Sequence, residues 1–351
     1  MSDKSERIKQ ANLRKEADLI IETLPRCARL YFRNIRIENK SERTIKQYAY
    51  DIKGFFEFVA NTDKFSNKDL NKLSIGDILN ELDKEDLQDY IDTIATYETN
   101  NEMRISSPSY ISRKISSLKS FYKYYYDCGD IKHNPSTLLK NPKLKQKNIL
   151  IMEKDEINRI IEAVKSEDGL SERELKFHKQ TLQRDLAIMM LFLGTGIRVS
   201  ELVGIDMSDL DFREASLKVV RKGGDEDEVF FSSSVQAQLE TYINTERDIL
   251  LDGKDEAALF ISNKKTRMTD RSVEMLIKKY SMKAGLNKKI TPHALRRTFG
   301  TNLYESTGDI YLTANALHHK SVDTTRQHYV RKNREMTRDA VTRLQMFDNN
   351  D

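Results

Sequence analysis

Apolar side chains recur every three to four residues along several long segments, and this helical spacing constrains the fold more than any other feature. In residues 41–60, Ser41 is a suitable N-cap and the recurring positions are Ile45, Tyr48, Ile52, Phe55, Phe56 and Val59. A second stripe, in residues 110–126, consists of Ile111, Ile115, Leu118, Phe121, Tyr122 and Tyr125. Both stripes predict amphipathic helices whose aromatic side chains are mostly core.

The remainder of the N-terminal half is also expected to be helical, with no convincing strand signal. Residues 5–24 predict a polar helix that ends near Pro25, and shorter helices are predicted at 75–82 and 84–98. A polar loop, ETNNEMRISSPS, should connect the last of these to the helix at 110–126. The expected N-terminal domain is therefore entirely helical.

A break in the helical pattern separates this half from the next. Gly129, Pro135 and Pro142 interrupt the periodicity, and the lysines that crowd the segment are Lys140, Lys143, Lys145 and Lys147. A chain of 351 residues is long enough for two domains with separate cores. We therefore expect an extension at 1–24, a helical domain at 25–133, a basic linker at 134–149, a second domain at 150–333 and a C-terminal helix with a tail at 334–351.

The second domain combines helices with a small sheet. Two strands, 216–221 and 228–231, are predicted as a hairpin around RKGGDED, and a short strand is expected at 259–262. The segments expected to be helical are 154–164, 183–193, 199–202, 234–251, 270–284, 292–305, 309–318, 322–329 and 334–345. The predicted fold class is thus mainly α, with an N-terminal helical domain and an α+β second domain.

Composition narrows the functional classes only slightly. The net charge of +4 permits a nucleic-acid partner but does not require one. Cys27 and Cys128 are far apart and have no metal-type spacing, which favours reduced thiols. No apolar run approaches the roughly 18 residues of a membrane span, and the charged N-terminus lacks a signal core. A cytoplasmic protein without membrane association is expected.

One candidate site residue pair lies in the segment TPHALRRTF. His293 and Arg296 are three residues apart, which places them on one face of a helix. Pro292 suits the first turn, so His293 would lie near the helix N-terminus, where an anion is favoured. An arginine fork binds two phosphate oxygens at once. A phosphate site fits this pair, although surface residues or a core histidine would produce the same pattern.

Two further cations occupy turns. Arg198 follows an apolar helix and a GTG turn, where an arginine is costly unless it meets an anion or an ion-pair partner such as Glu201. Lys222 lies at the tip of the predicted hairpin beside two glycines, so it could reach into a groove or be an ordinary turn lysine. His318 and His319 are adjacent and point in different directions on a helix, which disfavours a shared metal.

Taken together, these segments resemble the tyrosine recombinases, or phage-type integrases, and especially the bacterial Xer branch of that family. GTGIRVSEL resembles the first-arginine box, RKGG the hairpin lysine motif, TPHALRRTF the His-x-x-Arg box, and ALHHKSVDTTRQHYV the segment leading to the nucleophile. The resemblance implies that the catalytic residues are Arg198, Lys222, His293, Arg296, His319 and the nucleophile Tyr329, with Glu201 in support.

The resemblance also implies an activity and partners. The enzyme would cut and rejoin double-stranded DNA through a 3′-phosphotyrosyl link, with no metal or cofactor, in chromosome-dimer resolution or mobile-element movement. It would clamp DNA with a SAM-like core-binding domain at 25–133 and a catalytic domain at 150–333. Paired recombination sites would carry a homo-tetramer or a heterotetramer with a related recombinase, with an accessory activator left open.

Basic residues of the N-terminal half are candidates for contacting that DNA. Lys114 and Lys119 lie beside the apolar stripe at 110–126, and Lys143 and Lys145 lie in the linker. A helix with such residues can lie along a duplex and neutralise phosphates. An ordinary solvated face is an equally good interpretation of the helix alone.

The chain departs from the family pattern at two places. His318 replaces the usual glycine and Lys320 the usual serine, and GGDEDEVFF is acidic where further basic residues are common. These departures support an alternative, a catalytically silent sequence-specific DNA-binding protein on the same fold. A third class, a metal-dependent phosphodiesterase that uses the histidines, has little support and would be removed by activity that survives a chelator.

Overall fold

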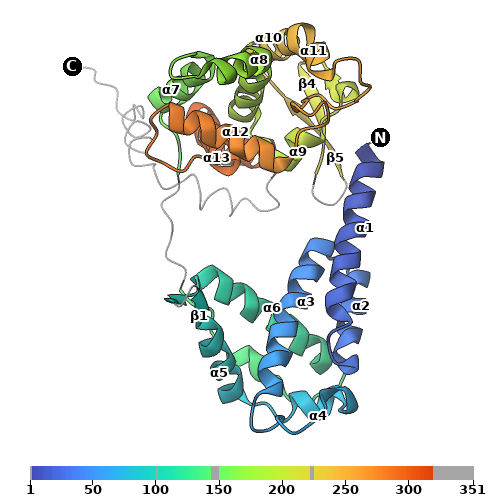
Figure 1. Cartoon of the computed structure of the whole chain (residues 1–351). Helices are drawn as coiled ribbons and strands as arrows, with labels where there is room; N and C mark the ends of the chain where they lie inside the picture. The colour runs from blue at the N-terminus through green and yellow to red at the C-terminus, as the bar shows by residue number, and fades with distance from the viewer. Residues whose placement is uncertain (1, 100–101, 144–149, 222–224, 319–351) are drawn as a thin grey trace, which may run out of the picture. The chain divides into compact units, whose positions relative to one another are not determined.

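The computed structural model describes residues 2–99, 102–143, 150–221 and 225–318 and divides into two compact units, Met1–Lys147 and Asn148–Asp351 (Figure 1). Each unit contains its own cluster of buried apolar side chains. The division falls within the segment for which the sequence predicts a basic linker. Because each unit has a separate core, each is described by itself.

The first unit is built from six helices and one hairpin among its described residues. These elements are α1 (Ser2–Ile21), α2 (Arg29–Ile37), α3 (Glu42–Ala60), α4 (Ile75–Leu79), α5 (Lys84–Ala95), β1 (Thr96–Thr99), β2 (Glu102–Ile105) and α6 (Pro108–Asp127). Short 3-10 turns lie at Arg26–Ala28, Leu70–Lys72 and Pro135–Leu138. The two long helices predicted from apolar spacing are α3 and α6.

Helices α3 and α6 start and pack for reasons visible in the sequence. The Ser41 side chain accepts a hydrogen bond from the backbone N–H of Thr44 and so caps α3. Ser107 caps α6 in the same way, and Pro108 occupies the first turn. Their apolar faces meet in an aromatic core, where the rings of Phe56 on α3 and Phe121 on α6 lie edge to face with centroids 5.9 Å apart. Such pairs contribute about 0.5–1.5 kcal/mol beyond their burial.

Helix α1 belongs to this same core, although the sequence suggested an extension. It packs along α3, and Ala17, Ile21 and Leu24 join the buried cluster of the first unit. An ion pair between Lys46 and Glu16 ties the outer faces of the two helices together. The segment 1–24 is therefore a structural part of the first unit.

The expectation of an entirely helical first unit is wrong at one place. Strands β1 (Thr96–Thr99) and β2 (Glu102–Ile105) pair antiparallel, with Thr96 opposite Ile105 and Thr99 opposite Glu102. Consequently α5 ends at Ala95, before the predicted boundary at residue 98. Nearly every side chain of the hairpin is exposed, so no alternation of apolar and polar residues marks the strands.

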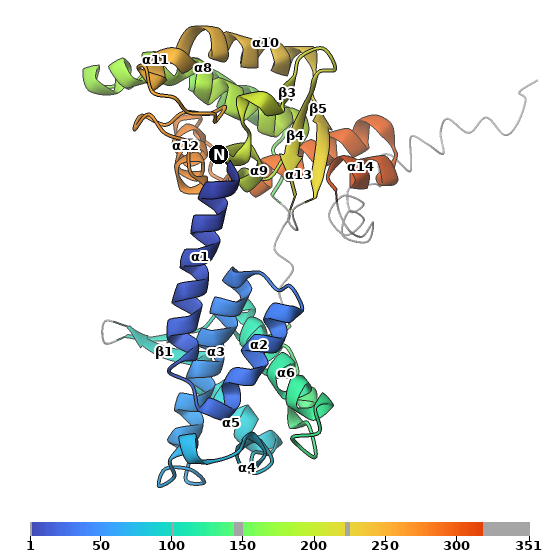
Figure 2. The same cartoon turned by 90° about the vertical axis from the view of Figure 1, so that its right-hand side faces the viewer.

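The second unit combines a three-stranded sheet with a larger set of helices (Figure 2). Its elements are α7 (Lys154–Lys165), α8 (Glu172–Thr195), α9 (Val199–Gly204), β3 (Leu210–Asp211), β4 (Ser216–Val220), β5 (Glu226–Phe230), α10 (Ser233–Tyr242), α11 (Asp248–Leu251), α12 (Asp270–Lys283), α13 (Pro292–Thr307) and α14 (Ile310–Ala316). The strand order is β3-β4-β5 and both pairings are antiparallel, with Val220 opposite Glu226 at the hairpin end. The predicted hairpin is confirmed, and β3 is an additional strand.

Two predicted elements of this unit differ from the structure. Helix α8 begins at residue 172, eleven positions before the predicted start at 183, and its N-terminal half is too polar to show an apolar stripe. The Glu246 carboxylate accepts hydrogen bonds from the backbone N–H groups of Gln183 and Arg184, where the apolar half begins. The strand expected at 259–262 is reduced to isolated bridges, Asp206 with Ala258 and Ile261 with Arg267.

Helix α8 is the central element of the second unit. It contacts α7, α10 and α13 (Figures 1 and 2). Most residues of its C-terminal half are buried. Within the described ranges, no helix is both long enough and apolar enough to cross a membrane. The C-terminal end of α8 leads directly into the turn that carries Arg198.

Candidate active site

The turn between α8 and α9 places Arg198. Gly196 ends α8 in the left-handed conformation, with φ of 62°, which disfavours residues with a Cβ. A Cβ at this position would also collide with the Phe299 ring of α13. Arg198 then acts as the N-cap residue of α9, and its side chain remains 39% exposed. The GTG turn is therefore required both by backbone conformation and by packing.

Glu201 holds Arg198 from the first turn of α9. One carboxylate oxygen accepts from Arg198 Nη1 at 2.6 Å, and the other accepts from the Arg198 backbone N–H at 2.7 Å. Arg221, at the end of β4, donates to that second oxygen at 2.7 Å. Burial alone would raise the pKa of the Glu201 carboxyl, but the hydrogen bonds from both arginines lower it below its ordinary value. Glu201 is thus an ionised, buried anchor for two arginines.

Arg221 connects Glu201 to Asp227 and, through Asp227, to His318, the last residue that the structure describes. Its Nε donates to an oxygen of Asp227 on β5 at 2.9 Å, and His318 Nδ1 lies 2.6 Å from the same oxygen. Burial and the nearby Arg221 charge lower the pKa of His318, while Asp227 opposes that shift. The five side chains form a continuous chain of contacts from Arg198 through Glu201, Arg221 and Asp227 to His318.

Arg296 links the turn between α8 and α9 to the residue that follows α14. Its guanidinium is buried, donates from Nη1 to the Gly196 backbone oxygen at 2.5 Å, and donates from Nη2 to the Leu317 backbone oxygen. The first bond joins residues 100 positions apart in the sequence, and the second joins residues 21 apart. The first-arginine turn, helix α13 and the segment before His318 are therefore brought to one place.

His293 lies at the N-terminus of α13, as its position after Pro292 predicts. Thr291 is the N-cap and its side chain accepts from the backbone N–H of Ala294. The His293 side chain is exposed, at the end of the helix where backbone N–H groups favour an anion. Three of the predicted site residues, Arg198, His293 and Arg296, therefore lie on α9 and α13 or at their starts.

The remaining predicted catalytic residues, Lys222, His319 and Tyr329, lie outside the described residues. Chain connectivity gives their nearest described neighbours: Lys222 follows Arg221, and His319 follows His318. The backbone N–H of Arg221 donates to the Asp225 oxygen at 2.8 Å, so the described ends of the hairpin loop lie together.

The proposed DNA-contacting lysines have different environments. Lys114 is buried, with its Nζ 3.6 Å from a carboxylate oxygen of the buried Asp51, so its prediction as a surface contact is corrected. Arg113 of the same helix pairs with the other Asp51 oxygen. Lys119 is half-buried and Lys143 exposed, whereas Lys145 is not among the described residues. Asp51, 63 positions from Lys114 along the chain, explains the difference.

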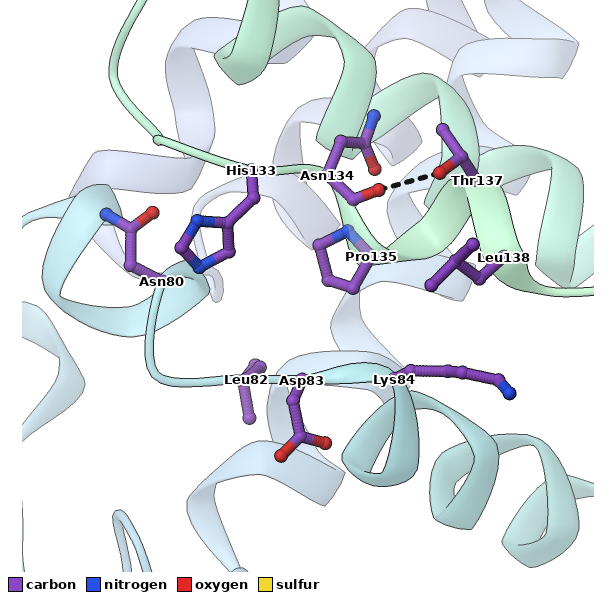
Figure 3. Close-up of a pocket in the computed structure, with 9 residues that line it drawn as sticks. All are labelled: Asn80, Leu82, Asp83, Lys84, His133, Asn134, Pro135, Thr137 and Leu138. Atoms are coloured by element: carbon purple, nitrogen blue, oxygen red, sulfur yellow. Dashed lines mark hydrogen bonds between the residues drawn. The ribbon is translucent and has the colours of Figure 1, made fainter.

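A pocket of about 320 Å³ lies in the first unit, away from these residues in sequence (Figure 3). Its polar side chains serve the local backbone: Asp83 caps α5, and Asn80 accepts from the backbone N–H of Lys132. Asn134 accepts from the backbone N–H of Ser136, and its own backbone oxygen accepts from the Thr137 hydroxyl. The pocket is therefore explained by helix capping and turn formation.

The described part of the chain contains no cluster of side chains suited to bind a metal ion. Among residues 2–99, 102–143, 150–221 and 225–318, no group of three or more His, Cys, Asp or Glu side chains is placed to hold an ion. The carboxylates nearest to Arg198 are instead occupied by arginines. The described site is a cluster of basic side chains organised by the buried Glu201 and the half-buried Asp227.

Sequence reasoning missed Arg221 and Asp227. The arginine directly precedes the lysine of the RKGG motif, and the aspartate lies in the acidic run GGDEDEVFF, which departs from the family pattern. In the structure this aspartate instead neutralises Arg221 and contacts His318. The available signal was that the two departures from the family pattern, an added histidine and an added acid, can form a hydrogen bond with each other.

Two family models match the chain, and they divide it where the structure does. The phage integrase family matches residues 151–336, and the N-terminal SAM-like domain of phage integrases matches residues 30–128. The first match alone covers more than half of the 351 residues. The chain belongs to the phage integrase family. It is accordingly a site-specific tyrosine recombinase, an enzyme that cuts and rejoins DNA.

Individual phage integrase family members support this placement. The tyrosine recombinase XerC of Thermodesulfovibrio yellowstonii is 36% identical over 62% of this chain and 70% of its own length. XerC of Caldanaerobacter subterraneus subsp. tengcongensis is 31% identical over 89% of this chain and 84% of its own. The solved XerH recombinase, bound to palindromic difH substrate, has the same fold, with a TM-score of 0.65, 18% identity and coverage of 87% and 80%.

Proposed function

We propose that Tyr329 is the nucleophile of this recombinase and attacks a phosphodiester of double-stranded DNA. In this proposal Arg198, Arg296, His293 and His319 stabilise the charge that develops on the phosphate, and Lys222 protonates the leaving oxygen. Glu201 positions Arg198. No metal or cofactor takes part in the proposed reaction.

One observation carries the proposal: sequence-distant family motifs converge in the described structure. Arg296 contacts the backbone on both sides of the site, at Gly196 before Arg198 and at Leu317 before the histidine pair. Arg221, next to Lys222, shares the Glu201 carboxylate with Arg198. Arg198, Arg296 and the described neighbours of Lys222 and His319 thus belong to one connected cluster, and Tyr329 follows His318 by eleven positions.

The cluster suits the transition state of phosphoryl transfer. Negative charge accumulates on the non-bridging oxygens, so preorganised cations and donors must converge there. Arg198 is fixed through Glu201 yet keeps more than a third of its side chain exposed, which leaves part of the guanidinium available to a phosphate. His293 adds a side chain at the exposed N-terminus of α13. Enzymes of such metal-free DNA cleavage must lower the barrier by an amount on the order of 20 kcal/mol.

The proposed reaction conserves the energy of the broken bond. The Tyr329 oxygen bonds to phosphorus while the bond from phosphorus to the 5′ oxygen breaks. The phenol, whose ordinary pKa is about 10, gives its proton to a base or to solvent, and the departing 5′ oxygen takes one from Lys222. A 5′-hydroxyl of a second strand then attacks the 3′-phosphotyrosyl link, and the tyrosine leaves.

The substrate and assembly follow from the family resemblance. We infer a tetramer that holds two paired recombination sites, formed by this chain alone or with a related recombinase. The Xer names of the relatives favour chromosome-dimer resolution, and movement of a mobile element is the other role this chemistry serves. A DNA substrate also agrees with the cytoplasmic location expected from the sequence.

The test of this proposal compares the wild type with Tyr329→Phe on pooled, nicked fragments of DNA from the source organism. The variant should form no denaturant-resistant adduct and should retain the same fragments as the wild type, because phenylalanine removes only the attacking oxygen. Cleavage by the variant would overturn the assignment of the nucleophile. Loss of fragment binding together with cleavage would instead indicate a structural role for Tyr329.

A further inference from the structure

Arg221 is a buried arginine that joins two elements of the catalytic unit. Its side chain is 9% exposed and contacts two carboxylates, Glu201 on α9 at 2.7 Å and Asp227 on β5 at 2.9 Å. An arginine fork can bridge two acids in one plane, whereas a lysine presents a single point charge. The side chain therefore fixes the end of the β4–β5 hairpin against the first turn of α9.

The backbone around Arg221 is held as well. Its N–H donates to the Asp225 oxygen at 2.8 Å, and the last strand pair before the loop is Val220 with Glu226. Successive Cα atoms are about 3.8 Å apart, so the start of Lys222 is set by the position of Arg221. A flexible lysine side chain can reach only as far as its own backbone origin allows.

The same Glu201 carboxylate also holds Arg198, with each oxygen bonded to a different guanidinium. We propose that Arg221 is a positioning residue that sets the reach of Lys222 relative to Arg198, an inference that rests on the proposed role of Lys222 as the acid. Through Glu201, the cation that would grip the phosphate and the cation that would protonate the leaving oxygen share one buried anchor.

Asp227 connects Arg221 to a third segment of the site, at His318. Its carboxylate accepts from Arg221 Nε and lies 2.6 Å from His318 Nδ1, directly before His319 in the chain. His318 takes the left-handed conformation, with φ of 47°, at the position where the family usually has glycine. The hairpin is thereby tied both to α9 and to the end of α14.

Charge balance supports positioning over direct contact with DNA. Arg198 and Arg221 face Glu201 and Asp227, so two guanidinium groups meet two carboxylates. Two carboxylates compensate the charge of Arg221, whereas the hydrogen bonds of Arg296 described above are to uncharged backbone oxygens. Arg221 thus acts through the groups that it holds, and its loss should affect the step that depends on Lys222.

The experiment measures single-turnover cleavage of a synthetic duplex that carries the site recovered by covalent trapping. One duplex has the normal 5′ oxygen and the other a bridging 5′ sulfur, which leaves without a proton. The variants are Arg221→Lys, Lys222→Ala and the double variant. Arg221→Lys keeps the charge and removes the bridge between the two acids. Arg213→Lys, an exposed arginine in the β3–β4 turn of the same sheet, is the matched control.

Arg221→Lys should slow cleavage of the oxygen duplex by about 100-fold, within the range of general acid catalysis, and should cleave the sulfur duplex within about threefold of the wild type. Lys222→Ala should show the same rescue, and the double variant should be no slower than Lys222→Ala, because both changes disable one step. Arg213→Lys should match the wild type on both duplexes.

Three results would overturn the inference. In the first, Arg221→Lys slows cleavage of both duplexes equally while sulfur rescues Lys222→Ala. Lys222 would then remain the proposed acid, but Arg221 would not be the residue that positions it. A failure of sulfur to rescue Lys222→Ala would remove the acid assignment and the inference with it. Wild-type rates for Arg221→Lys would show that the bridge is dispensable.

A measurement on the free protein guards against variants that fail to fold or to bind DNA. Hydrogen exchange of peptides spanning 216–230 should accelerate in Arg221→Lys and in Asp227→Asn, which removes the other end of the bridge, but not in Arg213→Lys. Unchanged exchange in both bridge variants would contradict the inference without any DNA substrate. Acceleration throughout the second unit would mean that Arg221 stabilises the fold as a whole and would contradict it as well.

Discussion

Arg296 Nη1 donates a hydrogen bond of 2.5 Å to the backbone oxygen of Gly196, across 100 positions of sequence. The same buried guanidinium donates to the Leu317 backbone oxygen. An arginine that satisfies two backbone carbonyls fixes the relation between the turn before Arg198 and the segment that leads to Tyr329. Helix α13 therefore joins the turn before Arg198 to the residue that follows α14.

Replacing Arg296 by lysine should both weaken the fold and abolish cleavage. A single ammonium cannot bond both the Gly196 and Leu317 oxygens in the same geometry, and a buried acceptor left unpaired costs about 1–3 kcal/mol. Urea unfolding should therefore show a loss of about 2 kcal/mol. Arg271→Lys, at an exposed arginine of α12, is the control and should change stability little. Equal stability of the two variants would contradict the bridging role.

Glu201→Gln should be among the more damaging single changes in the second unit. It leaves Arg198 and the nearly buried Arg221 without their shared anion, and breaking a buried ion pair typically costs about 3–5 kcal/mol. Chemical denaturation of the full chain measures this loss. Glu214→Gln, at an exposed turn position, should have almost no effect. A loss no larger than that of the control would mean that the Glu201 charge is not needed.

His318→Gly should be more stable than His318→Ala. A residue with a Cβ in the left-handed region costs about 1 kcal/mol relative to glycine, and His318 has φ of 47°. Both variants lose the contact with Asp227, but only glycine relieves the backbone. Thermal unfolding of the pair isolates the backbone effect. The reverse order would show that residue 318 does not keep this conformation in solution.

The stability of the protein should fall as the pH decreases below about 6.5, the ordinary pKa of histidine, in part because of His178. Burial lowers the pKa of this histidine, and Lys279 and Lys283 lower it further, against Asp185 and the Lys165 backbone. As the pH falls, His178 is therefore protonated at a lower pH in the folded state than in the unfolded state. Acid therefore favours unfolding until the folded pKa is reached.

The measurement is the urea midpoint of the wild type, His178→Gln and His133→Gln between pH 7.5 and 5. His178→Gln should flatten the decrease toward low pH, and the variant at the exposed His133 is the control. The slope that a single histidine can add is at most about 1.4 kcal/mol per pH unit. Identical pH profiles for the wild type and His178→Gln would remove His178 as a cause.

Local patterns predicted much of this structure. Apolar spacing located α3 and α6, the GTG turn predicted the break before Arg198, and the ion pair between Arg198 and Glu201 was one of two interpretations of that arginine. Each depends on residues within a few positions of one another. The helix periodicity and turn chemistry that produce them are local properties of the chain.

The features that escaped prediction depend on distant partners. Lys114 is buried because Asp51 approaches it from another helix, and nothing in its own segment distinguishes it from a surface lysine. Arg221 depends on Glu201, 20 positions earlier. The hairpin at 96–105 has exposed side chains, so its strands leave no apolar alternation to detect. In each case the structure depends on contacts between residues that are distant in the sequence.

The most direct test of the account is the covalent trapping of the protein on DNA. Pooled fragments of DNA from the source organism, nicked so that the cut end diffuses away, are mixed with the protein and EDTA. Denaturant-resistant adducts are then mapped by mass spectrometry and sequencing. The account predicts an adduct on Tyr329 that forms despite the chelator. Clear binding to particular fragments without any adduct would contradict it and would favour a DNA-binding protein that has lost catalysis.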